Sequence, residues 1–503
     1  MSSSSSKVPQ ALACGLAVLI AMSMPSAAGA AGDTRLIDAV KSANGPAIRL
    51  LLRDHVDVNA AEADGTTALH WAVRASDLGT VKQLLDAQAD VNASNRYAVT
   101  PLSVAATNGN EEMIATLVAA GANVNAALLE GETVLMTAAR TGRADAIKLL
   151  LVNGAEVNAK ESGLGETALM WAANENNAGA VALLIEAGAD VNARSAASPV
   201  PRLQYPRIGM IPADLPRGGW TALMYAARQG SIEAATKLAD GGADLNVKDP
   251  AGSTALILAI INQQYDLAKM LLDKGADPNA ADSTGMSPLY AAVDMHTVGW
   301  TQGRPLPKST SELDSVDIAK TLLAKGANPN SRLTSPILQR VHSRGDGSLG
   351  PGTTPFMRAS KWGDMTMMRL LLDNGADPTL RQKNHTTALM IAAGVGKRVG
   401  GDDEEDPRQR GTEQDAINAI KLCIERGIDV NAFNDVGDTA LHAASGEALI
   451  RFLVENGAKT DAENRLKQTP LDVLKKNKGE KSAAAQLLAK LSASASGAAP
   501  PRQ

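Results

Sequence analysis

A short phrase that begins with threonine or serine recurs along this chain at a nearly constant interval. It reads TALHWA at residue 67, TPLSVA at 100, TVLMTA at 133 and TALMWA at 167, and it continues as far as TPLDVL at 469. The steps between copies are 33, 33, 34, 54, 33, 33, 67, 33, 52 and 30 residues. A fixed period of roughly 20 to 50 residues indicates a repeat architecture, in which each copy is one supersecondary unit. We therefore expect one elongated array rather than several globular domains.

Local signals predict a pair of helices in each copy. The opening threonine can accept a hydrogen bond from the free amides of a helix N-terminus, and proline after it has φ already set for a helix. This first helix is expected to end near a glycine such as Gly109 or Gly142, which can take the left-handed conformation. Apolar residues three and four apart, such as Ile147, Leu150 and Leu151, predict a second helix. A polar stretch that ends in glycine then turns the chain towards the next copy.

These phrases closely resemble the ankyrin repeat, whose T-P-L-H-x-A and G-A-D-V-N-A patterns stand here almost verbatim. The resemblance covers residues 33 to about 493, with eleven copies of the first phrase and a degenerate first copy, TRLIDAVKSANGPAIRLLL, at 34. It implies about twelve repeats and an all-α solenoid of stacked helix-turn-helix units with short β-hairpin fingers. Neither helix of a pair can bury its apolar side alone, so neighbouring pairs must stack.

The first thirty residues differ from everything after them. Lys7 gives a basic start, residues 11–22 are mostly apolar, and small residues ending in AGA follow Pro25. This pattern is typical of a secretory signal peptide, with cleavage expected after Ala30. The apolar run is too short to span a bilayer core of roughly 30 Å, so we expect no stable membrane insertion. The sequence thus predicts an exported bacterial type, in the periplasm or secreted, with a solenoid over 31–493 and a disordered tail over 494–503.

Charge and cysteine content narrow the class of protein further. The formal net charge is -5, with acids and bases interleaved, which argues against a chain that binds nucleic acid. After cleavage only Cys423 remains, so no internal disulfide can form and packing alone must hold the fold. Cys423 falls at a second-helix position, where we expect a buried small apolar residue rather than a reactive thiol. We expect a monomer.

Nothing in the sequence forms a catalytic, metal or cofactor site. His70 and His442 occupy the histidine of the ankyrin phrase, and the resemblance implies a structural hydrogen bond between adjacent turns. No histidine pair has the spacing of a zinc site. The glycine pattern at 345–350 lacks a strand-turn-helix unit, and the acidic run at 402–406 lacks the spacing of a calcium loop. We therefore expect a protein that is not an enzyme and takes no cofactor.

Six aromatic residues divide into two groups by their position in the repeat. Three share one position inside the first helix, where we expect them to serve packing: Trp71, Trp171 and Tyr225. Three others fall on finger tips or late in the first helix, where we expect exposure: Trp220, Tyr97 and Trp362.

Four insertions break the period, at 196–216, 297–314, 332–351 and 395–414. All are predicted in connections rather than inside helices, and two of them, 196–216 and 332–351, enlarge fingers beside the concave groove. Long loops in compact proteins are commonly functional. Tyr205, Ile208 and Met210 stand among prolines, which predicts a loop that contacts a partner or covers the groove. The alternative is that this loop shields its own solenoid, and deletion of 195–216 would separate the two.

The leading interpretation is a non-enzymatic scaffold that binds a protein through its concave face and finger loops. The alternatives are a secreted effector that acts on a host-cell protein and a loop-based hydrolase or metal protein. The last alternative lacks the nucleophile, base or ligand cluster that it needs. The candidate contacts, read from variable positions of the family and from the first inserted loop, are Asp64, Thr66, Arg74, Tyr97, Val99, Glu130, Glu132, Arg140, Glu166, Tyr205, Ile208, Met210, Trp220, Arg228 and Gln229.

Overall fold

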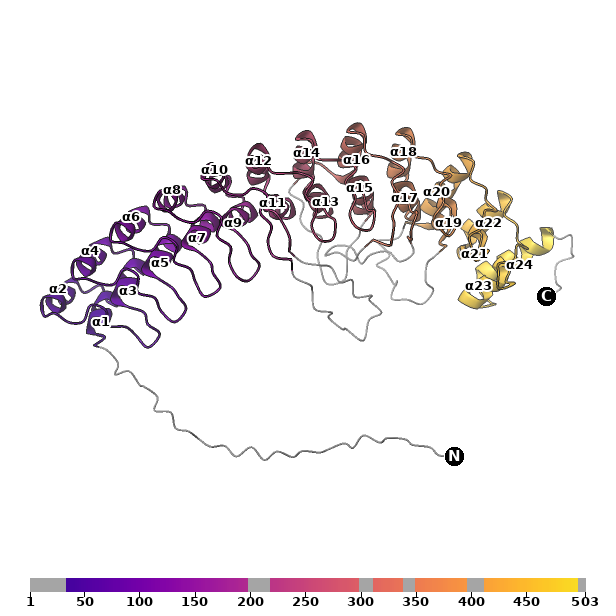
Figure 1. Ribbon diagram of the computed structural model, residues 1–503. Helices are drawn as coiled ribbons and strands as arrows, with labels where there is room; N and C mark the ends of the chain where they lie inside the picture. The colour runs from indigo at the N-terminus through magenta and orange to yellow at the C-terminus, as the bar shows by residue number, and fades with distance from the viewer. Residues whose placement is uncertain (1–32, 198–217, 298–310, 338–348, 396–410, 496–503) are drawn as a thin grey trace, which may run out of the picture.

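The computed structural model describes residues 33–197, 218–297, 311–337, 349–395 and 411–495. Its helices stack into one curved array of two layers (Figure 1). The first helix of each copy lies on the inner, concave side, and the second lies on the outer side. This arrangement confirms the predicted all-α repeat solenoid.

The inner layer begins near the N-terminus and consists of α1 (Arg35–Lys41), α3 (Ala68–Arg74), α5 (Pro101–Asn108), α7 (Val134–Thr141), α9 (Ala168–Asn174), α11 (Ala222–Gln229), α13 (Ala255–Ile261), α15 (Pro288–Thr297), α17 (Pro355–Lys361), α19 (Ala388–Ala393), α21 (Ala440–Ala443) and α23 (Pro470–Lys478). The outer layer consists of α2 (Gly45–Arg53), α4 (Leu78–Asp86), α6 (Glu111–Ala119), α8 (Ala144–Val152), α10 (Ala178–Glu186), α12 (Ile232–Asp240), α14 (Tyr265–Asp273), α16 (Ser315–Ala324), α18 (Met365–Asp373), α20 (Glu413–Glu425), α22 (Glu447–Glu455) and α24 (Ala483–Ala495). Each inner helix packs against the next inner helix and against its own outer helix.

The residues that open and close the inner helices do so as predicted. Thr100 Oγ1 accepts a hydrogen bond from the Ser103 amide at 3.2 Å, and Thr133 Oγ1 accepts one from the Met136 amide at 3.2 Å. At the other end Gly109 and Gly142 both have φ of 69°, in the left-handed region. A side chain at these φ values is strained, so glycine ends these helices at little conformational cost.

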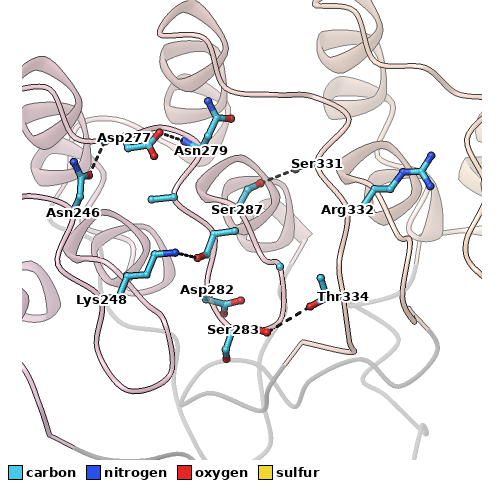
Figure 2. Close-up of a pocket in the computed structure, with 13 residues that line it drawn as sticks. Asn246, Lys248, Asp277, Asn279, Asp282, Ser283, Ser287, Ser331, Arg332 and Thr334 are labelled. Atoms are coloured by element: carbon cyan, nitrogen blue, oxygen red, sulfur yellow. Dashed lines mark hydrogen bonds between the residues drawn. The ribbon is translucent and has the colours of Figure 1, made fainter.

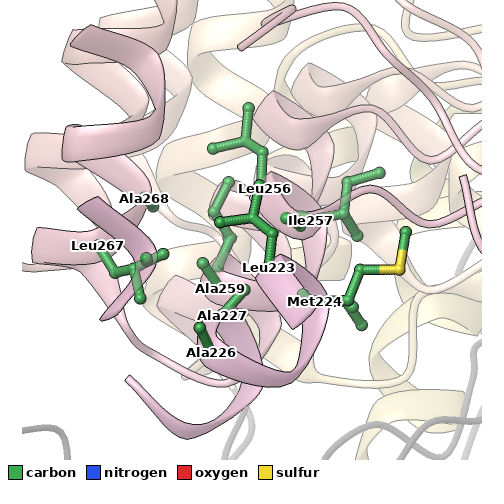
Figure 3. Close-up of a cluster of buried hydrophobic side chains, with 14 of the residues drawn as sticks. Leu223, Met224, Ala226, Ala227, Leu256, Ile257, Ala259, Leu267 and Ala268 are labelled. Carbon is green, nitrogen blue, oxygen red and sulfur yellow. The ribbon is translucent and has the colours of Figure 1, made fainter. Parts of the chain in front are cut away.

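The core runs the length of the array between the two layers. Figure 3 shows one section of it, where Leu223 on α11 and Leu256 on α13 lie beside Leu267 on α14. All three side chains are buried. Burial of a leucine side chain contributes about 1.5–3 kcal/mol, and this cluster includes residues of two neighbouring copies, since α11 belongs to one and α13 and α14 to the next. Stacking therefore supplies the burial that one pair of helices lacks.

An asparagine ladder explains why the second phrase repeats so closely. Asn92 Oδ1 accepts a hydrogen bond from the Asn123 amide of the next copy at 2.7 Å, and its Nδ2 donates to the Gly121 carbonyl at 3.0 Å. Asn330 makes the same two bonds to Asp377 and Gly375, at 2.8 and 3.0 Å. The asparagine of each phrase thus joins its own turn to the next one.

The two histidines of the first phrase also bridge adjacent copies, which confirms their predicted structural role. His70 Nδ1 lies 2.9 Å from Thr67 Oγ1, and its Nε2 lies 2.9 Å from the Val99 carbonyl oxygen of the next copy. A carbonyl can only accept, so Nε2 carries the proton. His442 makes the equivalent bond to Gln468 at 3.1 Å. Burial lowers the pKa of both rings, so each serves as a neutral bridge.

The fingers between copies have less strand pairing than the predicted β-hairpins. In the described residues their pairing is limited to isolated antiparallel bridges, such as Ala61 with Thr67 and Ala127 with Thr133. Adjacent fingers are joined at their tips instead. The Arg96 amide donates to the Asp64 carbonyl at 2.8 Å, for example.

Most of the four predicted insertions lies outside the described residues, as do the predicted signal peptide and the motifs at 345–348 and 402–406. The described ends of the insertions connect helices, except that Thr297 closes α15 and Glu413 opens α20. α24 ends at Ala495, inside the predicted tail 494–503, whose remainder is also outside the described residues.

Candidate functional site

The inner face between α1 and α12 gathers most of the candidate contacts. We use "inner face" for the side chains that α1, α3, α5, α7, α9 and α11 and their fingers present to the concave side. Arg74, Arg140 and Arg228 stand in the last turns of α3, α7 and α11 and are exposed, as is Gln229. Alternate inner helices thus present one arginine each.

The remaining candidates lie on the fingers. Tyr97 and Glu130 are exposed at finger tips, and Asp64 at the first tip is half-buried. Five candidates directly precede an inner helix and are half-buried: Thr66, Val99, Glu132, Glu166 and Trp220. Three others lie outside the described residues: Tyr205, Ile208 and Met210.

Aromatic rings on the inner face lie beneath these cations. The Arg74 guanidinium lies 5.3 Å from the centre of the Trp71 ring, that of Arg140 lies 5.4 Å from Trp171, and that of Arg228 lies 5.3 Å from Trp220. These distances are typical of cation–π contacts. The interpretation of Trp71 and Trp171 as packing residues was therefore incomplete, because both are half-buried and each contacts an arginine; Trp71 also has Lys41 Nζ 4.3 Å from its ring centre.

The expected exposure of the second aromatic group is right only for Tyr97. Its side chain is 51% exposed, and the Arg96 guanidinium lies 4.8 Å from its ring centre. Trp220 is half-buried because it packs edge-to-face on Tyr225, with ring centres 5.4 Å apart, and donates to Asp249 at 3.2 Å. Trp362 is half-buried as well.

Glutamate carboxylates of the inner face are bonded to other side chains of the same face. Glu62 accepts from Trp71 Nε1 at 2.8 Å and pairs with Lys41, and these bonds hold its pKa below the usual value. Glu132 accepts from Thr137 Oγ1 at 2.7 Å. Burial and a hydrogen bond with Glu166 raise the pKa of Tyr225. The acids therefore stabilise the fingers and aromatic side chains around them.

Sequence reasoning missed a pair of buried charges further along the array. Arg358 Nε on α17 donates to Asp294 Oδ1 on α15 at 2.6 Å, and the two side chains are only 5% and 9% exposed. Next to them His296 Nδ1 lies 2.6 Å from Asp364 Oδ2. The sequence did carry a signal. Asp294 stands at the position where α3, α7 and α11 carry arginine, and Arg358 stands at the position where α3, α9 and α11 carry an aromatic ring.

A polar cavity of about 620 Å³ lies between successive fingers near the middle of the chain (Figure 2). Its lining groups are largely bonded to one another: Lys248 Nζ donates to the Ala281 carbonyl at 2.7 Å, and the Ser287 and Ser331 hydroxyls lie 2.8 Å apart. In the described ranges, no group of three histidine, cysteine or acidic side chains could hold a metal ion. Cys423 is buried, as expected, and burial raises the pKa of its thiol to about 12.

Within the described part of the chain, every helix is either too short or too polar to span a lipid bilayer. Each outer helix has an exposed side and a buried side, as expected of an amphipathic helix that covers a core.

Comparison with known proteins points to one family. Models of ankyrin repeats match residues 36–128, 102–195 and 223–333 in sets of three copies, and 352–383 and 436–465 as single repeats. A mouse B-cell lymphoma 3 protein homolog is 31% identical over 125 residues, which are 24% of each chain. An ankyrin repeat protein predicted in Acanthamoeba polyphaga mimivirus is 27% identical over 124 residues, which are 22% of this chain and 20% of that one. The match thus spans about a quarter or less of these relatives. The matched phrases, the stacked helix pairs and the asparagine ladder together make this chain a member of the ankyrin repeat family.

Proposed function

We propose that this chain is a non-enzymatic scaffold that captures a partner protein on its inner face between α1 and α12. The observation that carries the proposal is the set of arginine–tryptophan stacks, because arginine and aromatic residues dominate the energetically important part of protein interfaces. Ankyrin repeats generally mediate contacts between proteins and are typically non-enzymatic, which supports the same function.

The finger tips extend this surface. Tyr97, Leu129 and Leu164 stand on three successive fingers and are 51%, 71% and 54% exposed. Exposed apolar side chains at the rim of a cationic and aromatic floor suit a partner segment that is both polar and apolar. The candidate contacts named from the sequence belong to this surface, apart from the three in the first inserted loop, which stays a predicted contact.

Photo-cross-linking with the full chain tests where the partner binds. A photoreactive residue would replace Thr107 or Gln229 on the inner face, and matched variants would carry it at Lys148 or Arg369 on the outer helices. All four side chains are exposed, so the fold should tolerate each change. We expect the same protein to be trapped from both inner positions and from neither outer one. Cross-links from the outer helices alone would refute capture on the inner face.

The proposal includes export, a mature chain that begins at Ala31, about twelve repeats and a monomeric state. N-terminal sequencing of the protein recovered from its native cell would test the cleavage, and light scattering would test the monomer. A secreted effector that acts on a host-cell protein is the alternative, favoured by the same leader. Recovery from the culture medium would support the effector, and recovery from a periplasmic extract would support the resident scaffold.

A further inference from the structure

Three arginines form an evenly spaced row on the inner face. Arg74, Arg140 and Arg228 belong to α3, α7 and α11, and a single inner helix, α5 or α9, packs between each neighbouring pair. Their guanidinium groups lie 5.3, 5.4 and 5.3 Å from an indole ring centre. Neighbouring helices pack about 8–10 Å apart, so the arginines stand roughly 20 Å from one another along the array.

Each guanidinium keeps hydrogen-bonding capacity beside its ring. An aromatic ring attracts the cation without using all five N–H donors, two of which can bind one carboxylate. Arg74 and Arg228 have no ion-pair partner among the residues that the structure describes. Arg140 approaches Glu132 at 3.5 Å, but that carboxylate already accepts the shorter bond from Thr137. The row therefore presents exposed N–H donors, and among the described residues only that of Arg140 has a carboxylate within ion-pair distance.

We propose that this row binds an acidic segment of the partner protein, with one carboxylate or carboxylate pair at each of Arg74, Arg140 and Arg228. The inference rests on the proposed function and adds the chemistry of the partner. In an extended segment, which advances about 3.3 Å per residue, the acidic sites would recur about every six residues.

The spacing favours discrete carboxylates over a nucleic acid. Each strand of a DNA duplex carries a phosphate every ~3.4 Å along the helix axis. A strand laid along the row would bring several phosphates between successive arginines and others beside Glu132, which lies 3.5 Å from Arg140. An acidic protein segment can place small or apolar residues there instead.

Fluorescence polarisation with synthetic peptides tests the proposal on the full chain. The probe is a labelled peptide of about 20 glycine and serine residues with a glutamate pair about every six residues. The matched control peptide carries glutamine in place of glutamate, and an oligo-dT of the same length serves as competitor. We expect the wild-type chain to bind the glutamate peptide at low salt, to ignore the glutamine peptide and to retain the probe against oligo-dT.

Variants then assign the binding to the row. Each of R74Q, R140Q and R228Q should weaken binding about tenfold, because each removes one charge-assisted contact with a carboxylate. The triple variant should lose binding. A second triple variant on the outer helices, K82Q with K148Q and R369Q, removes the same charge and should bind like wild type. All six side chains are exposed, and circular dichroism would verify that every variant folds.

Three results would overturn the proposal: no binding of the glutamate peptide, equal loss in both triple variants, or displacement of the probe by oligo-dT. Cross-linking separates this failure from failure of the proposed function. If Thr107 and Gln229 still trap a protein in the R74Q, R140Q, R228Q background, the inner face captures its partner by other contacts and the acidic segment is wrong. If they trap nothing in the wild-type chain, the proposed function itself fails.

Discussion

The inner face is open along its first half and closed in the middle of the array. The same position of the inner helix is half-buried in α3, α5, α9 and α11, where it carries Trp71, Val104, Trp171 and Tyr225, and in α7 it carries the buried Thr137. It is buried in α13, α15, α17 and α19, where it carries Leu258, Ala291, Arg358 and Ile391. One repeated framework thus offers an interaction surface in one region and an enclosed interior in the next.

One contact between neighbouring copies takes a different form in each region. The last-turn residue of one inner helix meets the central residue of the next, as Arg140 meets Trp171 and Asp294 meets Arg358. An arginine over an indole stays half in water and can still bind a partner. An aspartate that meets an arginine neutralises it, and both can then be buried. At this contact, two substitutions therefore distinguish a displayed arginine from an enclosed ion pair.

Removal of Arg358 tests the closed region and should have the largest effect. Arg358→Ala would leave Asp294 buried without its ion-pair partner, which typically costs about 3–5 kcal/mol. The matched change on the open face, Arg140→Ala, removes an exposed cation and should cost less than about 1 kcal/mol. Thermal unfolding followed by circular dichroism would compare the two, and equal losses would contradict the distinction between the regions.

The double variant Asp294→Leu, Arg358→Leu separates burial from charge. Replacement of a buried ion pair by apolar residues of similar size is often neutral or stabilising. We expect this double variant to melt close to the wild type and well above Arg358→Ala. A double variant as unstable as the single one would mean that the pair contributes something besides mutual neutralisation.

The two tryptophans of the open face differ in how their indole nitrogens are bonded. Trp71 Nε1 donates to Glu62, whereas Trp171 Nε1 is buried with no partner among the described residues. Glu161, the nearest equivalent of Glu62, accepts from its own finger at Leu164 and Glu166 instead. Trp→Phe removes the same ring volume at both sites, so the difference between the two variants reports the hydrogen bond together with the Lys41 contact that Trp71 has and Trp171 lacks.

We expect Trp71→Phe to lose about 1–2 kcal/mol more than Trp171→Phe, as measured by chemical unfolding. Trp171→Phe also removes an unsatisfied buried donor, which offsets part of its packing loss. If Trp171→Phe proves the more damaging change, the orphan nitrogen must have a partner, and the contrast drawn between the two sites would be wrong.

The asparagine ladder offers a smaller test, at a connection between two copies of the closed region. Thr379 stands where other copies carry asparagine, and its Oγ1 donates to Asp377 of its own turn at 2.6 Å. Thr379→Asn should add a bond to the next copy and raise stability by about 0.5–1 kcal/mol. Asn330→Ala, one copy earlier, should lower it by about 1 kcal/mol. Melting temperatures of both variants would check the pair, and a destabilised Thr379→Asn would show that the next copy is out of reach.

The period, the caps and the histidine bridges could be predicted because each depends on local chemistry that recurs in every copy. Thr100, Gly109 and His70 each act within one turn or on the adjacent one. The charge swap between Asp294 and Arg358 could not be predicted from such signals. It joins two residues 64 positions apart across an insertion, and each alone looks like an ordinary variable position.

The inner face was predicted as a set of variable positions without its internal bonds. Arg74, Arg140 and Arg228 were found because the family varies there, but their contacts with tryptophans depend on side-chain directions, and that of Arg140 with Trp171 also on the distance between neighbouring helices. The role of Glu62 was missed for the same reason. Its partners Lys41 and Trp71 lie on successive inner helices, and the sequence spacing alone does not give their orientation.

The pH dependence of stability should differ in sign between the two kinds of histidine, and it is the smallest effect. Burial lowers the pKa of His70, so the folded state resists a proton that the unfolded chain takes up below about pH 6.5. The contribution of the neutral His70 bridge to the free energy of unfolding is therefore complete above that pH and declines as the pH falls. His296 is the opposite case, because its bond to Asp364 raises its pKa. Its contribution is complete below about pH 6.5 and is lost as the pH rises through the raised value.

Melting temperatures of His70→Gln and His296→Gln between about pH 5.5 and 8 would test both signs against the wild type. The deficit of His70→Gln should grow with pH, while that of His296→Gln should shrink, each by on the order of 1 °C. Carboxylates that titrate elsewhere are common to all three chains and cancel in the differences. Parallel slopes for the two variants would mean that His296 is also held neutral, in which case the closed region would contain a carboxylate–imidazole hydrogen bond rather than a second ion pair beside Asp294 and Arg358.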